Sequence, residues 1–550
     1  MTPTDPLFSQ QWHLFNSIAG QLDLNVSPVW DDYTGSGVRV AVIDNGFDLN
    51  HPDLSGNVNT SIDYDYSGSD FDPSAAFGNN HGTAVMGIIG AQQGNGVGGV
   101  GVAWNAELVG FRGFGINSFF GDDVLRDAAG IGNGIGNTNG GTAANGADVI
   151  NMSGGLGSTV FLNTGNIIDA QTALEDIATN GRGGLGSIFV KSSGNSRAAA
   201  NSTLREEGTA DGYDTVRHSI NVAAVDATGS VTNYSTPGAN VLVSAFAPSS
   251  GQSPGILTTD RVGTNGYNTS ASPSGDYTSG FNGTSAAAPQ VAGVVALMLE
   301  ANDQLGWRDI QQILAYSARH SGSDVGTAAA GFEQATQIGG ESWFWNGGSN
   351  WNGGGMHFSN DYGFGIVDAL AAVRLAESWS LQQTSGNEVS VTQDMDGSSG
   401  PTALDNSFAD FTQNIATDIH VQHIEVVVDF ATTYLSDLEV FLTSPDGTRV
   451  QLIADTGDSA NYDGSWIFGS TAFLGESSQG NWTVRIVDDA SLDLTTIRDV
   501  DLQIFGSATN ADDLFIFTNE FSDHVGGSGG HGTAFNGGSG TNTVNASAVS

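Results

Sequence analysis

Three short segments contain the residue types that nucleophilic acyl transfer requires. Asp44 ends an apolar run in AVIDNGFDLNHPDL, His81 lies in NNHGTAVMGIIG, and Ser285 lies in FNGTSAAAPQVAGVVALML. A serine hydroxyl is a poor nucleophile until an imidazole accepts its proton, and the imidazole needs a carboxylate to fix its tautomer and stabilise its charged form. A serine at a helix start also lies beside free backbone N–H groups that favour an oxyanion. The three segments therefore predict an Asp–His–Ser triad.

Each residue also has an ordinary structural interpretation. Taken alone, an aspartate at a strand end is commonly a turn residue, a histidine beside glycine a surface or core residue, and a serine before alanines a helix N-cap. The sequence His-Gly-Thr-Ala recurs at His531, within a low-complexity segment and with no apolar helix behind it. We interpret that recurrence as a coincidence. The triad prediction depends on all three segments occurring together, in this order and in suitable contexts.

The elements that must hold these residues alternate between strands and helices over residues 1–377. The apolar run at 285–300 predicts a buried helix that begins at Ser285. This alternation predicts an α/β domain with a parallel sheet between helices. The Gly-, Asn- and Trp-rich stretch 339–355 predicts a surface loop. The runs with strand and helix patterns are 38–43, 149–150 and 188–191 for strands and 167–179 for a helix.

The sequence pattern changes after residue 377. Residues 388–507 contain alternating apolar and polar runs separated by turn residues, which predicts an all-β domain. Residues 508–550 are Gly-rich and low in hydrophobicity, and are predicted to form an acidic tail. Within it, 537–545 (GGSGTNTVN) matches one degenerate calcium-binding β-roll repeat, with Asn542 where aspartate is usual. A β-roll start and a plain Gly-rich linker both remain open; a genuine repeat would indicate a bacterial protein.

The charge balance restricts the partners. The chain has 59 acidic and 15 basic residues and a net charge of −44 at pH 7, which repels nucleic acid and anionic membranes. A negative charge of this size would favour binding of calcium or basic peptides, or an environment of high salt, or it serves only to keep the protein soluble. The absence of cysteine excludes disulfides and thiol catalysis, so extra stabilisation is expected from calcium. The longest apolar run, 291–299, is too short to span a membrane, and the N-terminus lacks signal-peptide features.

The motifs around the three residues resemble those of subtilisin-clan proteases, namely DNG at 44–46, HGT at 81–83 and GTSAAAP at 283–289. Further segments resemble the kexin- and furin-like proprotein convertase branch over the first 375 residues. They include DPLFSQQWHLFN (5–16), GVGVAWNAELVGFR (99–112), GRGGLGSIFVKSSGN (181–195), ADGYDTVRHSINVAAV (210–225) and YGFGIVDA (362–369). The β domain, with YLSDLEVFLTSPDGTRVQL (434–452) and GNWTVRIVDDA (480–490), resembles the P domain of those convertases, a β-sandwich.

The resemblance implies a role for each matching residue. Ser285 would attack the scissile carbonyl, His81 would act as general base and then acid, and Asp44 would orient His81. Asn195 would supply the side-chain donor of the oxyanion hole, beside the backbone N–H of Ser285. Small residues let a peptide backbone approach, so the edge that pairs with the substrate is expected at three of them. These are Ser153, Gly154 and Gly155.

The resemblance also implies a calcium site around the loop 92–99 (QQGNGVGG). Calcium prefers sets of oxygen ligands, here three side chains and three backbone carbonyls. The side chains are Asp5, Asp53 and Asn95, and the carbonyls belong to Gln92, Val97 and Gly99. The alternative is a glycine-rich turn beside an unrelated aspartate.

Several positions depart from the convertase pattern, in which acidic side chains line the pockets for paired basic residues. Asn45, Gly78 and Thr236 are neutral where the branch has acids, and SGGLGS at 153–158 replaces another acidic motif. Asp211 remains and would favour Arg or Lys at the first subsite. Strict dibasic specificity is not expected, nor is the calcium site that accompanies that pocket in the family.

These observations together predict a three-layer α/β peptidase domain followed by a β-sandwich. The protein is expected to be a calcium-dependent, secreted serine endopeptidase that acts as a monomer on proteins or peptides. A broad-specificity degradative protease is the first alternative. A non-catalytic binding scaffold is the second, and loss of a triad or oxyanion residue would have favoured it; all four are present.

Overall fold

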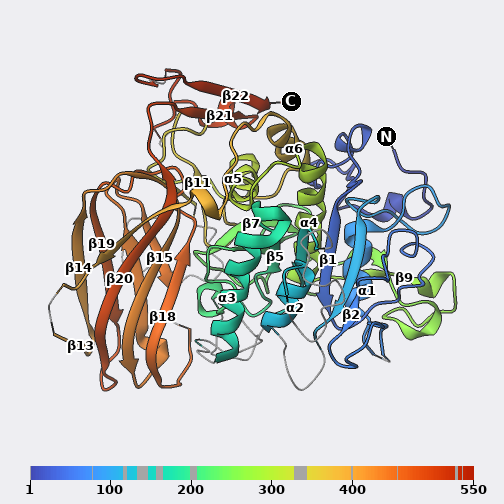
Figure 1. Cartoon of the computed structure of the whole chain (residues 1–550), viewed down its shortest axis with the longest axis horizontal. Helices are drawn as coiled ribbons and strands as arrows, with labels where there is room; N and C mark the ends of the chain where they lie inside the picture. The colour runs from blue at the N-terminus through green and yellow to red at the C-terminus, as the bar shows by residue number, and fades with distance from the viewer. Residues whose placement is uncertain are drawn as a thin grey trace.

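A computed structural model of the chain describes residues 2–76, 78–114, 121–132, 146–155, 161, 165–197, 207–326, 343–397, 400–454, 456–526, 530–534 and 537–549. Figure 1 shows a layered α/β domain beside a β-sandwich, with the C-terminal strands lying against the α/β domain.

The apolar runs of the first half of the chain form one parallel sheet of seven strands, in the order β2-β3-β1-β4-β5-β6-β7. Strands β4 to β7 are buried throughout, as expected where helices cover both faces of a sheet. The strands are β1 (Arg39–Asp44), β2 (Tyr64–Asp65), β3 (Glu107–Arg112), β4 (Val149–Met152), β5 (Ile188–Ser192), β6 (Ser219–Val225) and β7 (Val241–Phe246).

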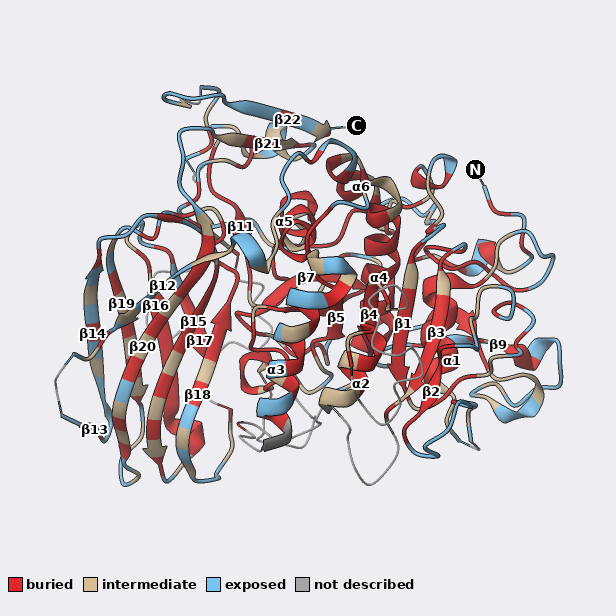
Figure 2. Ribbon diagram, in the orientation of Figure 1, coloured by how far each residue is buried: buried red, intermediate tan, exposed pale blue. Residues whose placement is uncertain are grey.

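Helices cover both faces of this sheet and complete the predicted three-layer domain (Figure 2). One face carries α2 (Gly121–Ala128) and α3 (Gly165–Asn180), which pack against each other. The other side carries α1 (His81–Gly90), α4 (Thr284–Ala301), α5 (Trp307–Ser317) and α6 (Ala369–Ser378). By length and composition α4 could cross a membrane, but 89% of its apolar window is buried in the fold, so it is a core helix. Two short hairpins are formed by β8 (Ile256–Thr259) with β9 (Tyr277–Phe281) and by β10 (Phe344–Trp345) with β11 (His357–Phe358).

The second domain consists of two antiparallel sheets, as the alternating sequence pattern predicts. One has the order β12-β20-β15-β18, with β13 pairing with β20, and the other has the order β14-β19-β16-β17. The strands are β12 (Val389–Asp394), β13 (Thr402–Leu404), β14 (Ser407–Ile415), β15 (Ile419–Thr432), β16 (Leu438–Thr443), β17 (Arg449–Ile453), β18 (Tyr462–Ser470), β19 (Gly480–Asp488) and β20 (Thr495–Ala508). Buried residues alternate with exposed or half-buried ones along β19, which gives the domain a core face and an outer face.

The two domains share one continuous hydrophobic core. The ring of Phe161 packs against Trp466 at a centroid distance of 4.9 Å, and the Trp466 indole N–H donates to the carbonyl of Thr209 (2.8 Å). On the other side of the interface, the Arg308 guanidinium donates to the side chain of Gln422 and to the carbonyl of Gly506. The sandwich is therefore packed firmly against the peptidase domain.

The segment after the sandwich folds back onto the α/β domain. It contains β21 (Leu514–Thr518), α7 (Phe521–His524) and β22 (Thr543–Ala548), and β21 pairs with β22 in parallel. The amide of Asn545 donates to the hydroxyl of Ser378 at the end of α6 (2.9 Å). The domain limits at 377, 388 and 507 stay predictions, as does the β-roll interpretation of 537–545.

The predicted surface loop at 339–355 is wrong for its described part, residues 343–355. Trp343 and Trp351 are among the largest fully buried side chains of the described chain. The Trp351 indole donates to the carbonyl of Tyr316 (2.9 Å), and the backbone of Asn352 donates to the carbonyl of Ile516 in β21 (2.8 Å). The C-terminal segment covers this loop, so its glycines and tryptophans belong to an interface.

Candidate active site

The predicted catalytic residues gather at one edge of the parallel sheet. Asp44 is the last residue of β1, Ser153 follows β4, and Asn195 follows β5. After β1 the chain forms β3 on one side and β4 on the other, so the direction of the strand order reverses at β1. Open parallel sheets bind ligands beyond the carboxyl ends of their strands at such a reversal. The topology alone thus places these residues at the expected ligand-binding edge.

His81 is the first residue of α1 and is paired with Asp44. The imidazole Nδ1 lies 2.8 and 3.0 Å from the two carboxylate oxygens of Asp44, which is buried. The next residue must be small, because a β-carbon at Gly82 would lie 2.9 Å from Cβ of Asp44. The hydroxyl of Thr83 accepts a hydrogen bond from the backbone N–H of Asp48 (2.9 Å), which holds the loop after β1. Each residue of the His-Gly-Thr motif has its own positional role.

Two opposing effects determine the charge of the His81 imidazole. Burial disfavours the imidazolium, but the charge of Asp44 and the hydrogen bond with it outweigh burial, so the pKa of His81 is raised. Because a carboxylate can only accept, Nδ1 carries the proton in the neutral ring and Nε2 keeps its lone pair. The ring of Phe281 packs edge-on against the imidazole at 5.3 Å between centroids. The arrangement is that of a proton acceptor with a fixed tautomer.

Ser285 is the second residue of α4 and exchanges hydrogen bonds with Ser153. Pro289 lies four residues later and has no N–H, so the carbonyl of Ser285 lacks its helical donor. The hydroxyl of Ser153 donates to that carbonyl (3.1 Å), and the hydroxyl of Ser285 donates to the carbonyl of Ser153 (3.2 Å). Among the described residues no hydrogen bond joins Ser285 to His81, although their helices α4 and α1 pack together. Hydrogen bonds between nucleophile and base are often absent or long before substrate binds.

Asn195 is held by the residue that precedes the serine. Its Oδ1 accepts hydrogen bonds from the backbone N–H (2.9 Å) and the hydroxyl (3.0 Å) of Thr284. Because Oδ1 is occupied, Nδ2 is the free end of the amide, and in the described part of the chain it donates to no protein group. Asn195 is exposed, so a substrate oxygen can reach that donor. The structure therefore brings an amide donor and the N-terminus of α4 to one place.

The predicted substrate edge lies over a buried ion-pair cluster. A β-carbon at Gly155 would lie 3.3 Å from Oδ2 of Asp211 and 3.3 Å from Nζ of Lys191. The Lys191 ammonium is 1% exposed and lies 2.7 Å from Asp214 and 3.5 Å from Asp211. Burial disfavours this ammonium, but the two carboxylates outweigh burial, so the pKa of Lys191 is raised and the side chain stays charged. Next to Gly155, Gly154 faces the ring of Phe114, 3.0 Å from where its β-carbon would be.

Sequence reasoning missed Lys191 as a residue of this site. The available signal is that the only lysine of the chain occurs at the end of an otherwise apolar strand run, IFVK. Burial raises the pKa of the adjacent Asp214 to about 8, against the lowering effect of the Lys191 ammonium beside it. The ammonium thus lies between the carboxyl groups of Asp211 and Asp214 and offsets part of their negative charge.

The neutral positions that depart from the convertase pattern also have structural partners. The side-chain oxygen of Asn45 accepts from the backbone N–H of Gly82 (3.3 Å). The hydroxyl of Thr236 accepts from the backbone N–H of Ser196 (3.1 Å), next to Asn195. Gly78 is exposed, with a φ of +85°. None of these positions contributes a negative charge to the site.

The predicted calcium ligands come together around the loop 92–99. Oδ2 of Asp53 is buried without a well-formed hydrogen bond, although the Tyr277 hydroxyl and the backbone N–H of Gly99 lie close enough to lower the pKa of Asp53, and a β-carbon at Gly98 would lie 2.0 Å from this oxygen. Burial raises the pKa of Asp53 to about 7, against the lowering effect of its hydrogen bond with Asn95. Both oxygens of Asp5 accept from the N–H of Gly94 (2.9 Å each).

The backbone of the same loop provides free oxygens. In the described part of the chain the carbonyls of Gln92, Val97 and Gly99 accept no hydrogen bond. The Asn95 side chain instead gives its oxygen to the N–H of Val97 (3.0 Å). An unpaired buried carboxylate oxygen, a second carboxylate and unpaired carbonyls are a donor set that suits a hard divalent cation. The residues present therefore fit calcium, with Asn95 the one predicted ligand whose oxygen is already engaged.

Comparisons with known proteins identify the family. The model of the subtilase family matches residues 35–365, more than half of the chain, and the model of the proprotein convertase P-domain matches residues 421–504. The chain is a member of the subtilase family. This subtilase carries a convertase-type P-domain, and it is a serine-type endopeptidase.

Similar proteins agree with this assignment. Neuroendocrine convertase 2 of Rattus norvegicus is 30% identical over 510 residues, covering 88% of this subtilase and 71% of the relative. Furin-1 of Xenopus laevis is 29% identical over 502 residues, covering 88% of this chain and 56% of the relative. Among solved structures, a serine protease of Aeromonas sobria, in a complex with a chaperone, matches with a TM-score of 0.75 and 26% identity over 92% of this chain and 96% of that one.

Proposed function

We propose that this endopeptidase cleaves peptide bonds through an acyl-enzyme in which Ser285 is the nucleophile. The Ser285 hydroxyl turns from the carbonyl of Ser153 towards Nε2 of His81, and its oxygen bonds to the scissile carbonyl carbon as the proton passes to Nε2. His81 then gives that proton to the leaving amine as the C–N bond breaks. Water repeats the sequence in reverse, and Ser285 is regenerated as the acid product leaves. Asp44 holds the Nδ1 tautomer and stabilises the imidazolium that forms in each step.

The oxyanion of the tetrahedral intermediate would be bound by two donors. They are the side-chain amide of Asn195 and the backbone N–H of Ser285 in the first turn of α4, where helical N–H groups have no partner. Ser153, Gly154 and Gly155 would pair with the extended substrate. The observation that carries the proposal is the fixed Asp44–His81 pair at the carboxyl edge of the sheet, together with Ser285 at a helix start.

A serine-directed phosphonofluoridate label provides the direct test. We expect one adduct per active chain, on the tryptic or other proteolytic peptide that contains Ser285, and loss of labelling in His81→Ala. Ser230→Ala, which changes a serine of a turn far along the chain, serves as the matched control and should label normally. A labelled serine other than Ser285, or an unlabelled but folded wild type, would exclude the mechanism and favour the non-catalytic scaffold.

The specificity that we propose is broad at the first subsite, in preference to a strict requirement for basic residues. Asp211 is the carboxylate that the convertase resemblance assigns to basic selectivity, yet the ammonium of Lys191 lies 3.5 Å from it within the protein and offsets part of its charge. A guanidinium entering this pocket would meet a carboxylate and an ammonium at similar distances from Gly155. This specific observation favours a degradative protease over a processing protease that requires Arg or Lys.

Calcium dependence is the third part of the proposal. Asp5, Asp53 and the carbonyls of Gln92, Val97 and Gly99 would hold the ion, which supplies charge compensation for the buried carboxylates and fixes the loop that begins after α1. Calcium is abundant outside cells, and we propose secretion for a chain that lacks cysteine and carries a net charge of −44. We expect a monomer, which light scattering at assay concentration will test.

A further inference from the structure

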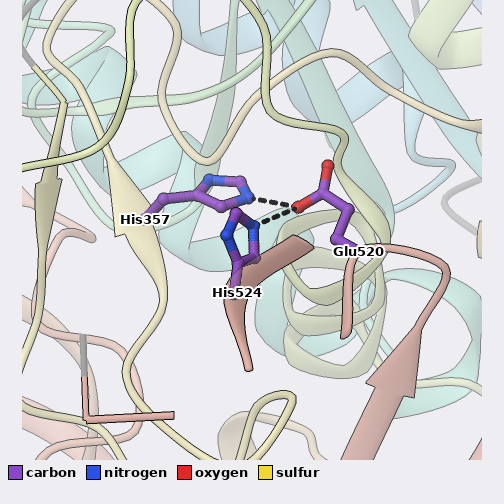
Figure 3. A group of neighbouring side chains, drawn as sticks. All are labelled: His357, Glu520 and His524. Carbon is purple, nitrogen blue, oxygen red and sulfur yellow. Dashed lines mark hydrogen bonds and ion pairs between the residues drawn. The ribbon is translucent and has the colours of Figure 1, made fainter. Parts of the chain in front are cut away.

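A second cluster of titratable side chains lies far along the chain from the triad (Figure 3). His357 and His524 both direct Nε2 at the same carboxylate oxygen of Glu520, at 2.8 and 3.3 Å. All three atoms lie within 4.8 Å of one another. His357 is buried and the other two side chains are no more than 14% exposed. Two imidazoles and one carboxylate converging on one point form an incomplete coordination shell.

We propose that His357, Glu520 and His524 form a binding site for a transition-metal dication, of which Zn²⁺ is the biological candidate. Two imidazole nitrogens and a carboxylate oxygen suit zinc, whereas calcium and magnesium prefer sets of oxygens alone. In a tetrahedral zinc site with bonds of about 2.0–2.2 Å, neighbouring ligand atoms lie about 3.3 Å apart. The His524–Glu520 distance has this value (3.3 Å), and the His357–Glu520 distance of 2.8 Å is shorter than it.

The surroundings hold the Glu520 carboxylate in place, whereas Nδ1 of His357 is buried without a hydrogen-bond partner. The second oxygen of Glu520 accepts a hydrogen bond from the backbone N–H of His320, which fixes the carboxylate. Glu520 and His524 stand four residues apart across the single turn of α7, so they face the same side. The ring of Trp351 packs against His357 at 4.9 Å between centroids and keeps water from that imidazole.

A third imidazole lies next to the cluster. His531 is buried, and its ring centroid lies 5.6 Å from that of His524. Its Nε2 lies 2.8 Å from the carbonyl of Gly355, which can only accept, so Nε2 carries the proton and Nδ1 keeps a lone pair. That Nδ1 is buried and has no hydrogen-bond partner. A carbonyl-oriented imidazole with an unused lone pair is the usual form of a metal-binding histidine, so His531 is a candidate fourth ligand, although it lies outside the group of ligand atoms within 4.8 Å of one another.

The position of the site indicates what the metal would do. His357 belongs to β11 of the peptidase domain, whereas the other two ligands belong to the C-terminal segment. A bound ion would therefore fasten that segment over the buried tryptophan loop at 343–355. The chain has no cysteine and cannot make this link with a disulfide. Because the ion would bind the folded state, it would raise the stability of the segment.

The test uses the full chain, freed of transition metals by dialysis against a chelator with calcium kept in excess. We expect isothermal titration with Zn²⁺ to show one tight site in the wild type. His524→Ala and Glu520→Gln should weaken binding at least 100-fold, more than the 10–100-fold that loss of an outer partner costs. Co²⁺ should give the visible absorption of a tetrahedral site in the wild type but not in His524→Ala or Glu520→Gln. His531→Ala should alter that spectrum.

His81→Ala is the matched control, because it removes an imidazole that is paired with a carboxylate elsewhere in the fold. It should bind Zn²⁺ as tightly as the wild type. Near-ultraviolet circular dichroism and peptide hydrolysis should show that His524→Ala and Glu520→Gln are folded. The proposal is overturned if the wild type binds no stoichiometric Zn²⁺, because the cluster is then only a hydrogen-bonded carboxylate between two histidines. Equal affinity in His524→Ala and the wild type overturns it as well.

Discussion

Replacing Lys191 should convert the first subsite from broad to basic. The variant Lys191→Met removes the buried ammonium, and combining it with Asp214→Asn avoids leaving a second carboxylate buried without a partner. Breaking a buried ion pair from one side costs about 3–5 kcal/mol, and the double variant is designed to keep that loss of stability small. Asp211 then becomes the only formal charge of the former cluster, next to Gly155.

The size of the effect follows from the position of Gly155. Its β-carbon would be 3.3 Å from both the ammonium and the carboxylate, so the two fields nearly cancel along the substrate edge in the wild type. Unit charges about 4 Å apart interact by about 4 kcal/mol at an effective dielectric constant of 20. The carboxylate of Asp211 is 21% exposed, and solvent screening lowers that figure. We therefore expect the preference for Arg over Leu, measured as the ratio of their kcat/KM values, to rise roughly 10- to 100-fold. This change corresponds to about 1.4–2.8 kcal/mol.

The assay compares kcat/KM for two peptides that differ only in having Arg or Leu before the scissile bond. The ratio of Arg to Leu should rise in Lys191→Met/Asp214→Asn, and adding Asp211→Asn should return it to the wild-type value. Salt should reduce the gain, since the attraction is electrostatic. If the double variant hydrolyses the Leu peptide normally and its ratio does not change, then Asp211 does not face the first substrate side chain. In that event the resemblance to convertase pockets is misleading at this position.

Four further outcomes test the remaining assignments. The acid limb of the pH profile of kcat/KM should have an apparent pKa above the ordinary histidine value, since His81 must be neutral to act as a base and Asp44 raises its pKa. Asp44→Asn should lower that apparent pKa and reduce turnover roughly 10⁴-fold. An acid limb that does not move in this variant would refute the pairing of His81 with Asp44. Asn195→Ala should reduce kcat by roughly 10²–10³ with little change in KM, whereas a loss confined to KM would place the residue in substrate binding. Chelation of calcium should lower the Tm of the wild type but have a smaller effect on Asp53→Asn, and equal shifts would place the stabilising ion elsewhere. The imidazole of His13 is buried without hydrogen-bond partners and burial lowers its pKa to about 3, so this group reduces the stability of the folded state as pH falls below about 6.5. In chemical denaturation, His13→Leu should raise the free energy of unfolding at pH 5 by about 2 kcal/mol more than at pH 8. Stability-against-pH curves that run parallel in variant and wild type would contradict this prediction.

Much of the site could be predicted because local patterns determine it. The segment that ends at Asp44 is a buried strand, and the chain direction fixes that its last residue points to the ligand-binding edge. The small residue after His81 and the proline after Ser285 reflect contacts within a few ångströms of the functional atoms. Sequence patterns of this kind preserve the geometry of a site, and they were sufficient to predict the two fold classes.

Other features could not be predicted because they depend on contacts between distant segments. The buried state of Lys191 depends on Asp214, which lies in the connection between β5 and β6, and no periodicity relates the two. The recurrence of His-Gly-Thr-Ala at His531 gives no sign that this imidazole is buried against Gly355, in a cluster formed by separate parts of the chain. The tail is polar in composition, and composition shows whether a segment can form its own core but not whether it covers another one.

The segment that carries Asp211 shows how far this dependence on distant contacts extends. Thr209 accepts a hydrogen bond from the indole of Trp466, and the hydroxyl of Thr215 donates to the carbonyl of Ile467 (2.6 Å), so β18 of the sandwich holds the segment on both sides of Asp211. The carboxylate of Asp211, which is predicted to contact the first substrate side chain, is thus positioned by Lys191 of the peptidase domain and by backbone contacts of its segment with the P-domain. Movement of the sandwich relative to the sheet would change the distance between Asp211 and Gly155. If Asp211 has the proposed role, the P-domain would help to set specificity, although in the described structure it supplies none of the predicted catalytic residues.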